Sequence, residues 1–250
     1  MAVTLPLTHL NERLVCILSF PRTLRELAIA RIVELWILGI REIISEGRLE
    51  LCGIKVIGKG TNSVVFKARH ESLGTVLVKA LRVDSPRTSL LKEARILQLT
   101  NRRGVGPKLY FYTRSFLVEE YVEGEPLHEW VKKADTGTLR RTLRSVIDQL
   151  HALDAIGVSH GELSRPGDHI LVTKHGDPVL IDFESASLER SKSNLTQFMN
   201  ALLFADKLRL LRVKLGLEDA EKESIISVLR AYKKERSNKY VAKIFDLLDL

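Results

Sequence analysis

The spacing of apolar residues divides the chain into a helical start, a strand-rich middle and a helix-rich second half. Residues 1 to about 46 are predicted to form an N-terminal helical extension, because apolar residues from Leu24 to Leu38 recur at the helical period. Thr23 and Glu26 have the spacing of a capping box, which predicts that a helix begins there. This extension carries no candidate chemistry.

The next segment is predicted to form an antiparallel lobe of five strands with one helix. Runs of β-branched and apolar residues, separated by turns that contain glycine, are typical of short strands. A helix is expected to begin at Ser85 and Pro86, since serine suits an N-cap and proline suits a first turn. The predicted strands are 49–57, 64–69, 75–83, 109–113 and 116–121, and the helix is 85–102.

The rest of the chain is predicted to form a mostly helical lobe. Apolar spacing from Leu139 to Leu153 indicates one long amphipathic helix. Short strands at 170–173 and 178–181 follow, and then helices at 194–215, 218–234 and 239–248. We therefore expect an α+β fold of three parts, the extension (1–46), a first lobe (47–122) and a second lobe (123–250).

Composition sets the broad class of protein. The chain has 250 residues, 45% of them hydrophobic, which is enough for a substantial core. Its formal net charge of +8 favours anionic partners such as nucleotides or nucleic acid. No apolar run is long enough for a bilayer span, and the start lacks the pattern of a signal peptide. Cys16 and Cys52 show no paired spacing, so neither a disulfide framework nor a zinc site is predicted, and a cytoplasmic protein without membrane association is expected.

A glycine-rich motif lies between two predicted strands. It consists of Gly58, Lys59, Gly60, Thr61, Asn62 and Ser63, and Val64 and Val65 follow it. Because β-forming residues rather than a helix follow the glycines, the motif is interpreted as a hairpin whose backbone N–H groups cover phosphates. Taken alone, it fits an ordinary turn equally well.

Lys79 lies in the middle of an otherwise apolar run, 77–81, of a predicted strand, and a buried ammonium group needs an anion. Glu93 is the only glutamate between Ala80 and Val118, and the helical period places it on the apolar side of its helix. An ion pair between Lys79 and Glu93 is therefore expected. The alternative is an edge strand from which the lysine reaches solvent.

A polar loop connects the long helix to the strand at 170–173, and it contains His160, Glu162 and His169. Polar residues gathered at such a junction are typical of a functional site. Asp182 comes directly after an apolar strand, where a carboxylate suits a hard cation such as Mg²⁺. The alternative for Asp182 is a turn-forming role.

The order of these motifs resembles the protein-kinase-like fold over residues 49 to 190. The glycine hairpin, Lys79, Glu93, the segment 118–122, the His-Gly-Glu loop and the Asp-Phe-Glu sequence carry this resemblance. The chain is similar to the atypical branch, which includes RIO kinases, the kinase of the KEOPS tRNA-modification complex and aminoglycoside phosphotransferases. It most closely resembles an archaeal family of predicted serine/threonine protein kinases.

The resemblance implies that ATP and Mg²⁺ bind between two lobes. The implied nucleotide contacts are Gly58, Lys59, Gly60, Thr61, Asn62, Ser63, Val65, Lys79, Glu93, Glu120, Val122 and His169. Within this set, Lys79 would bind the α- and β-phosphates, and Glu93 would orient Lys79. Asp182 would bind the metal, and Glu162 would hold the position of the catalytic base.

Three departures from the family pattern affect the activity. Glu162 replaces an aspartate, His169 stands where a second metal-binding asparagine is expected, and Glu184 replaces a glycine. His169 and Glu184 are therefore only weak candidates for metal ligands. The expected reaction is transfer of the γ-phosphate of ATP to a serine or threonine hydroxyl of a protein or of the chain itself. The alternatives are a pseudokinase or ATPase that acts as a binding module on RNA–protein particles, and a small-molecule phosphotransferase.

Basic residues are frequent in the second half, which makes RNA a candidate partner. They are Lys207, Arg209, Arg212, Lys214, Arg230, Lys233, Lys234 and Arg236. The alternative is that these side chains only form solvated helix faces.

Overall fold

A computed structural model describes residues 3–189, 192–217 and 219–250. Contacts within the chain define two compact units. The first comprises Met1–Arg95 and Lys108–Tyr121, and the second comprises Ile96–Pro107 and Val122–Leu250. The division of the sequence into an extension and two lobes at 46 and 122 stays a prediction, and each unit is described by itself.

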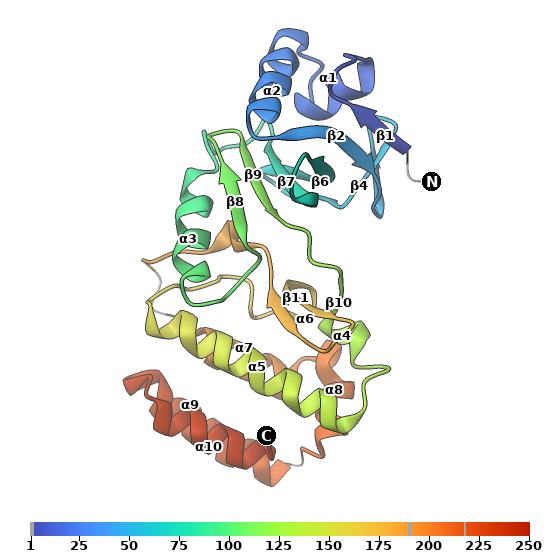
Figure 1. Ribbon diagram of the computed structural model, residues 1–250. Helices are drawn as coiled ribbons and strands as arrows, with labels where there is room; N and C mark the ends of the chain where they lie inside the picture. The colour runs from blue at the N-terminus through green and yellow to red at the C-terminus, as the bar shows by residue number, and fades with distance from the viewer. Residues whose placement is uncertain (1–2, 190–191, 218) are drawn as a thin grey trace. The chain divides into compact units, whose positions relative to one another are not determined.

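The first unit is built on an antiparallel sheet of seven strands (Figure 1). In sheet order the strands are β1 (Val3–Pro6), β2 (Ile40–Ser45), β6 (Ser63–His70), β7 (Gly74–Leu81), β9 (Phe116–Glu120) and β8 (Leu109–Tyr112), and β5 (Gly58–Lys59) pairs with β6. A separate hairpin consists of β3 (Leu49–Leu51) and β4 (Ile54–Val56). The single strand predicted over 49–57 is therefore a hairpin.

The extension is not only helical, since it supplies two of the seven strands of the sheet, whereas the other five, β5 to β9, lie within the predicted first lobe. β1 and β2 belong to the extension, and β2 pairs with β6 in a register that places Ile43 opposite Ala68. Ile40 and Ile43 are fully buried in the hydrophobic core of this unit. The helix before β2 ends close to Gly39, whose φ of 79° is costly for any residue with a side chain. A Cβ atom there would also lie 2.4 Å from His70 Nε2, so glycine is required at this reversal.

Three helices belong wholly or partly to the first unit: α1 (Glu12–Leu18), α2 (Arg25–Ile37) and α3 (Leu91–Asn101). Asn11 caps α1 by accepting a hydrogen bond from Leu14 N at 3.0 Å. The capping box predicted for α2 is absent, because Leu24 holds the N-cap position and makes no side-chain cap bond. The start predicted for α3 at Ser85 is also wrong. The Ser85 hydroxyl donates instead to Asn62 Oδ1 at 2.8 Å, in the turn before the helix.

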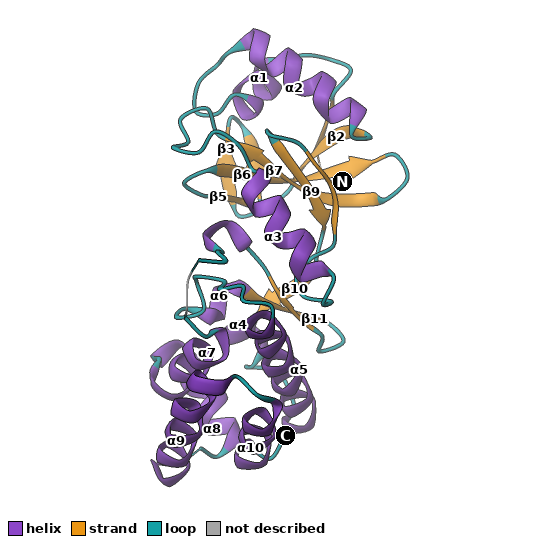
Figure 2. Ribbon diagram, turned by 90° about the vertical axis from the view of Figure 1, so that its left-hand side faces the viewer, coloured by secondary structure: helices purple, strands orange, loops and turns teal. Residues whose placement is uncertain are grey.

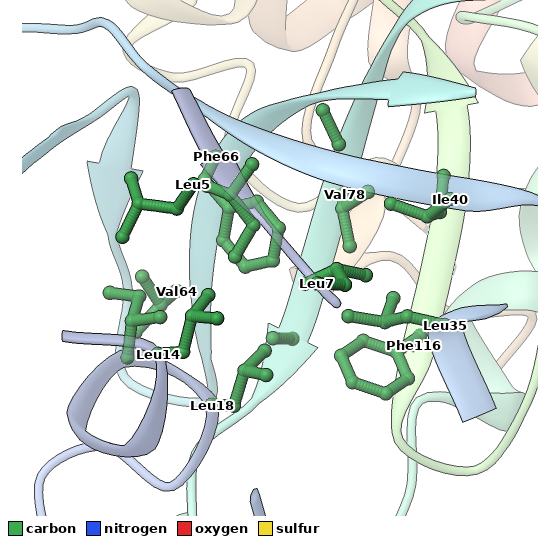
Figure 3. Close-up of a cluster of buried hydrophobic side chains, with 14 of the residues drawn as sticks. Leu5, Leu7, Leu14, Leu18, Leu35, Ile40, Val64, Phe66, Val78 and Phe116 are labelled. Atoms are coloured by element: carbon green, nitrogen blue, oxygen red, sulfur yellow. The ribbon is translucent and has the colours of Figure 1, made fainter. Parts of the chain in front are cut away.

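Apolar side chains from the extension and from the sheet form one core in the first unit (Figure 3). Leu14 and Leu18 of α1 and Leu35 of α2 pack with Phe66 and Phe116 of the sheet, and all five are fully buried. Burial of a side chain of this size contributes roughly 1.5–3 kcal/mol. The extension is therefore an integral layer of the first unit.

The two cysteines form a disulfide, which corrects the prediction that they are unpaired. Cys16 on α1 and Cys52 in the turn between β3 and β4 have Cα atoms 5.8 Å apart, although 36 residues separate them in sequence. Their spacing along the chain gave no signal because the pairing depends on how α1 packs next to the β3–β4 hairpin. The bond closes a loop that contains α2 and β2.

The second unit combines a small antiparallel sheet with a helical body (Figure 2). Its strands are β10 (Gly124–Pro126), β11 (Ile170–Thr173) and β12 (Pro178–Leu180). Its helices are α4 (Leu127–Trp130), α5 (Thr136–Ala155), α6 (Pro166–His169), α7 (Asn194–Phe204), α8 (Arg209–Leu215), α9 (Asp219–Glu235) and α10 (Asn238–Leu248). The helix predicted over 194–215 is interrupted at Ala205, whose extended backbone separates α7 from a short 3₁₀ turn. Glu218, where the next helix was predicted to begin, lies outside the described residues.

Within the described part of the chain, no helix has both the length and the apolar character that a bilayer crossing needs.

Candidate functional site

Lys79 and Glu93 form the buried ion pair that the sequence predicted. Lys79 Nζ lies 2.6 Å from Glu93 Oε1, and the two residues are 5% and 2% exposed. β7 supplies the lysine and α3 supplies the glutamate. Breaking a buried pair of this kind is costly because one charge is then left in a medium of low polarity.

Glu119 is a third member of this group that sequence reasoning missed. It is 2% exposed, and its Oε1 lies 4.0 Å from Lys79 Nζ. The register pairs Lys79 with Leu117 on β9, so Glu119 lies two residues along on the same face of the sheet. A glutamate in an apolar strand next to the lysine strand was the available signal. Lys79 therefore lies between two buried carboxylates.

The glycine-rich motif forms a hairpin of β5 and β6, as the sequence predicted. Gly58 pairs with Val65, and Gly60 N donates to Ser63 O at 2.9 Å. Val65 also lies directly opposite Lys79 in the register of β6 and β7, so both side chains are on one face of the sheet. Ser63 itself is only 2% exposed, so its side chain is turned into the fold.

Residues around the hairpin hold its tip. Arg82 Nη1 donates to Gly60 O at 2.6 Å, and its guanidinium group also binds Asp84. The charged groups of Arg82 and Lys59 lie 5.4 Å and 5.7 Å from the centre of the Phe20 ring. Phe20 comes two residues after the end of α1, so the extension contacts the hairpin within the first unit.

Glu120 and Val122 are the implied nucleotide contacts of the segment 118–122, and the backbone N–H group of Glu120 is engaged within the first unit. Glu120 N donates to Lys108 O at 2.8 Å, and Glu120 Oε2 accepts from Lys108 N at 3.2 Å. The N–H group of Glu120 is therefore already used between β8 and β9. Val122 begins the next stretch of the second unit.

In the second unit, His160 lies at the centre of the predicted polar residues. It is fully buried, its Nε2–H donates to Ile181 O at 3.0 Å, and its ring lies 4.8 Å from that of Phe183 and 5.9 Å from that of His169. Ile181 N donates in turn to His169 O at 2.9 Å. These contacts hold the loop that contains His160 next to Asp182, which follows Ile181.

Burial lowers the pKa of His160 to about 4, and His169 adds to this shift, whereas the charges of Asp182 and Glu162 oppose it. His160 is therefore neutral at pH 7. Its Nε2 carries the proton because Ile181 O can only accept. Glu162, His169 and Asp182 therefore all act electrostatically on this buried ring.

Lowering the pH from 7 to 5 is expected to cost about 2 kcal/mol of stability through His160 alone. In the unfolded chain the histidine has an ordinary pKa near 6.5. Between that value and about 4, the unfolded state binds a proton that the folded state does not, so stability falls as the pH decreases through this window. Chemical unfolding at pH 7 and pH 5 measures the effect, and a His160→Gln variant is expected to lose less. An equal loss in both proteins would contradict this assignment.

Asp182 has a backbone conformation that is rare for a residue with a side chain, with φ 67° and ψ 74°. Its neighbour Phe183 is buried and fixes this turn. A Cβ atom on Gly106 would lie 2.7 Å from the Phe183 ring, so glycine is needed there to admit the ring. Strained backbone of this kind often occurs at functional sites, and here it sets the direction of Asp182.

The carboxylates in this part of the second unit are suited to Mg²⁺ but do not form a closed metal site. Asp182 and Glu184, two residues apart, are both partly exposed, as are Glu162 and His169. Among the residues that the structure describes, no three His, Cys, Asp or Glu side chains form a metal-binding group. Carboxylates with open positions fit a Mg²⁺ ion that also binds phosphate oxygens and water.

Several of the basic residues that suggested an RNA surface have structural partners. Arg212 donates to Leu202 O and Ala205 O at 2.8 Å, and Lys214 donates to Ala134 O at 2.7 Å. Lys207 forms an ion pair with Asp168. The arrangement of these side chains is explained by the fold, and RNA binding stays a prediction.

Comparisons with known proteins find relatives in the protein-kinase-like superfamily. No protein-family model matches the chain. It is 30% identical over 129 residues to KEOPS complex subunit Bud32 of Pyrococcus abyssi, covering 50% of this chain and 56% of that protein. It is 24% identical over 154 residues to serine/threonine-protein kinase Pkn1 of Myxococcus xanthus, covering 54% of this chain and 21% of that protein.

A third relative is similar over nearly its whole length. An uncharacterized protein of Methanocaldococcus jannaschii is 29% identical over 117 residues, which are 46% of this chain and 98% of the archaeal protein. The chain thus spans about half or less of the relatives that are named for an activity or a complex.

Proposed function

Since this chain is a relative of the protein-kinase-like superfamily and has archaeal relatives, we propose that it is an atypical serine/threonine protein kinase that uses ATP. The observation that carries the proposal is the buried ion pair of Lys79 and Glu93. A lysine fixed in this way within a sheet is a ready partner for nucleotide phosphates. The carboxylate of Glu93 holds the ammonium group of Lys79 in one orientation.

The proposal assigns roles to groups within each unit. In the first unit, Lys79 would bind the α- and β-phosphates, and the backbone of Gly58 and Gly60 would cover phosphate oxygens. In the second unit, Asp182 would be the main metal ligand, with Glu184 two residues away as a further carboxylate. Bound Mg²⁺ would neutralise charge that develops on the transferred phosphate.

Glu162 is proposed as the group that accepts the proton of the acceptor hydroxyl. During transfer, the bond from the γ-phosphorus to the bridging oxygen breaks and ADP leaves with that electron pair. A new bond forms between phosphorus and the acceptor oxygen, and the hydroxyl proton passes to the Glu162 carboxylate. The acceptor is a serine or threonine hydroxyl of another protein or of this chain.

Replacing Glu162 with glutamine is expected to lower the rate of transfer about 10²-fold and to leave the affinity for ATP unchanged, because an amide cannot accept the proton. The measurement is label incorporation from γ-labelled ATP with Mg²⁺ into the chain itself and into a mixed protein substrate. Glu125→Gln, at an exposed glutamate on β10, is the matched control. Equal labelling by the wild type and Glu162→Gln would exclude Glu162 as the base.

Wild-type protein that binds ATP but gives no labelled product would contradict the kinase proposal. That outcome favours the second candidate, a nucleotide-dependent binding module on RNA–protein particles. Its support is the glutamate at the base position and the likeness to a subunit of the KEOPS complex. RNA retention that weakens steeply as the salt concentration rises would then be expected.

A further inference from the structure

A buried carboxylate of α5, outside the proposed site, accepts hydrogen bonds from residues at the start of α7 and on α9. Asp154, near the end of α5, is 4% exposed. It accepts from Ser193 Oγ at 2.7 Å, from Asn194 N at 2.7 Å and from Asn194 Nδ2 at 2.9 Å, all at the start of α7. It also accepts from Tyr232 of α9. A buried acceptor with this many donors fixes the groups around it.

Asn194 connects this carboxylate to the loop that contains His160. Its Oδ1 accepts from His160 N at 2.8 Å, and its Nδ2 donates to Val158 O at 2.6 Å. Because Asp154 can only accept, the amide nitrogen of Asn194 must face it, and the amide oxygen is thereby directed to His160 N. Asp154 thus determines the orientation of the side chain that holds the backbone two residues before Glu162.

Tyr232 reaches this network from α9, which pairs with α10 (Figure 1). It is fully buried, and its hydroxyl donates to Asp154 Oδ2 at 3.0 Å. Burial and the neighbouring Asp154 raise the pKa of Tyr232, so the hydroxyl keeps its proton. The same hydroxyl lies 2.9 Å from His151 Nδ1, and His151 Nε2 lies 2.6 Å from Asn238 Oδ1 at the start of α10.

We propose that Tyr232 and Asp154 are positioning residues for Glu162, so that the α9–α10 hairpin sets the geometry of phosphate transfer through Asn194 and His160. This inference rests on the proposed function. Without the Tyr232 hydroxyl, Asp154 Oδ2 loses a donor, and the hold on Asn194 becomes looser. A displacement of about 1 Å at a reacting group costs up to about 10²-fold in rate, so a small shift of this loop is sufficient.

The test uses Tyr232→Phe, which keeps the buried ring and removes only the hydroxyl. The control is Tyr240→Phe, which removes a hydroxyl from α10 of the same hairpin, away from Asp154. We expect Tyr232→Phe to lower kcat about tenfold with KM for ATP unchanged, and Tyr240→Phe to change neither. An equal fall in kcat in both variants would overturn the proposal. So would an effect of Tyr232→Phe on KM alone, with kcat unchanged.

A second measurement does not depend on activity. Backbone hydrogen exchange is followed over residues 158–162 and, for comparison, over 139–150 of α5. We expect faster exchange at 158–162 in Tyr232→Phe, with 139–150 unchanged. Unchanged exchange at 158–162, or an equal increase in both segments, would overturn the positioning role. If the wild type transfers no phosphate, the proposed function fails. Hydrogen exchange at 158–162 then still tests whether Tyr232 holds this loop in place.

Discussion

Replacing Asp182 with alanine is expected to lower the rate of phosphate transfer about 10³-fold, the upper end of what one electrostatic group contributes. Asp182 follows β12, and its backbone is held by the buried Phe183, so the carboxylate has a fixed direction. In the proposed reaction Asp182 would hold the Mg²⁺ ion that neutralises charge on the transferred phosphate, so Asp182→Ala would lose that ion. The measurement is label incorporation from γ-labelled ATP under single-turnover conditions.

The matched control is Asp177→Ala, at an exposed aspartate in the turn between β11 and β12. It is expected to retain wild-type activity. Thermal unfolding with and without ATP and Mg²⁺ supplies a second readout, since a ligand that binds the folded state raises the Tm. The wild type and Asp177→Ala should show this rise, and Asp182→Ala should show a smaller one. Equal labelling by the wild type and Asp182→Ala would remove Asp182 from the proposed site.

Replacing Glu93 with alanine is expected to lower the free energy of unfolding of the first unit by about 3–5 kcal/mol. The change leaves Lys79 buried without its partner at 2.6 Å, with Glu119 at 4.0 Å. The chain contains two tryptophans, Trp36 and Trp130, and Trp36 lies in the first unit. Fluorescence of Trp36 in a Trp130→Phe background therefore follows unfolding of this unit in denaturant.

An exposed ion pair on the same sheet supplies the control. Arg69 Nε lies 2.7 Å from Glu42 Oε1, and the side chain of Arg69 is 53% exposed. Glu42→Ala is expected to cost less than about 1 kcal/mol, because solvent screens such a pair. Similar losses for Glu42→Ala and Glu93→Ala would mean that burial of the Lys79 pair has no special weight in stability.

The candidate groups could be predicted where the signal was local. A lone lysine in an apolar strand and a single glutamate on the following helix were enough to predict the Lys79–Glu93 pair, and the structure confirms it. Glu119 was missed because its proximity to Lys79 depends on the register of β7 and β9, which neither strand specifies by itself. What these groups bind stays a prediction.

The structure of the N-terminal extension could also be predicted only where it depends on local sequence. Helical spacing in α2 was recognised, but β1 and β2 were not, since short strands become stable only through partners distant in sequence. The predicted helix start at Ser85 failed for a related reason. Its hydroxyl binds Asn62, more than twenty residues earlier, and this tertiary contact takes the place of a helix cap.

The bond between Cys16 and Cys52 has a practical consequence for measurements on this protein. Dithiothreitol or a similar thiol would open a loop that spans 36 residues and remove the covalent link between α1 and the β3–β4 hairpin. Phe20, which contacts the glycine hairpin, comes shortly after Cys16. Solutions with and without reductant therefore contain two covalent forms of the chain, and nucleotide affinity needs to be compared between them before values from different buffers are combined.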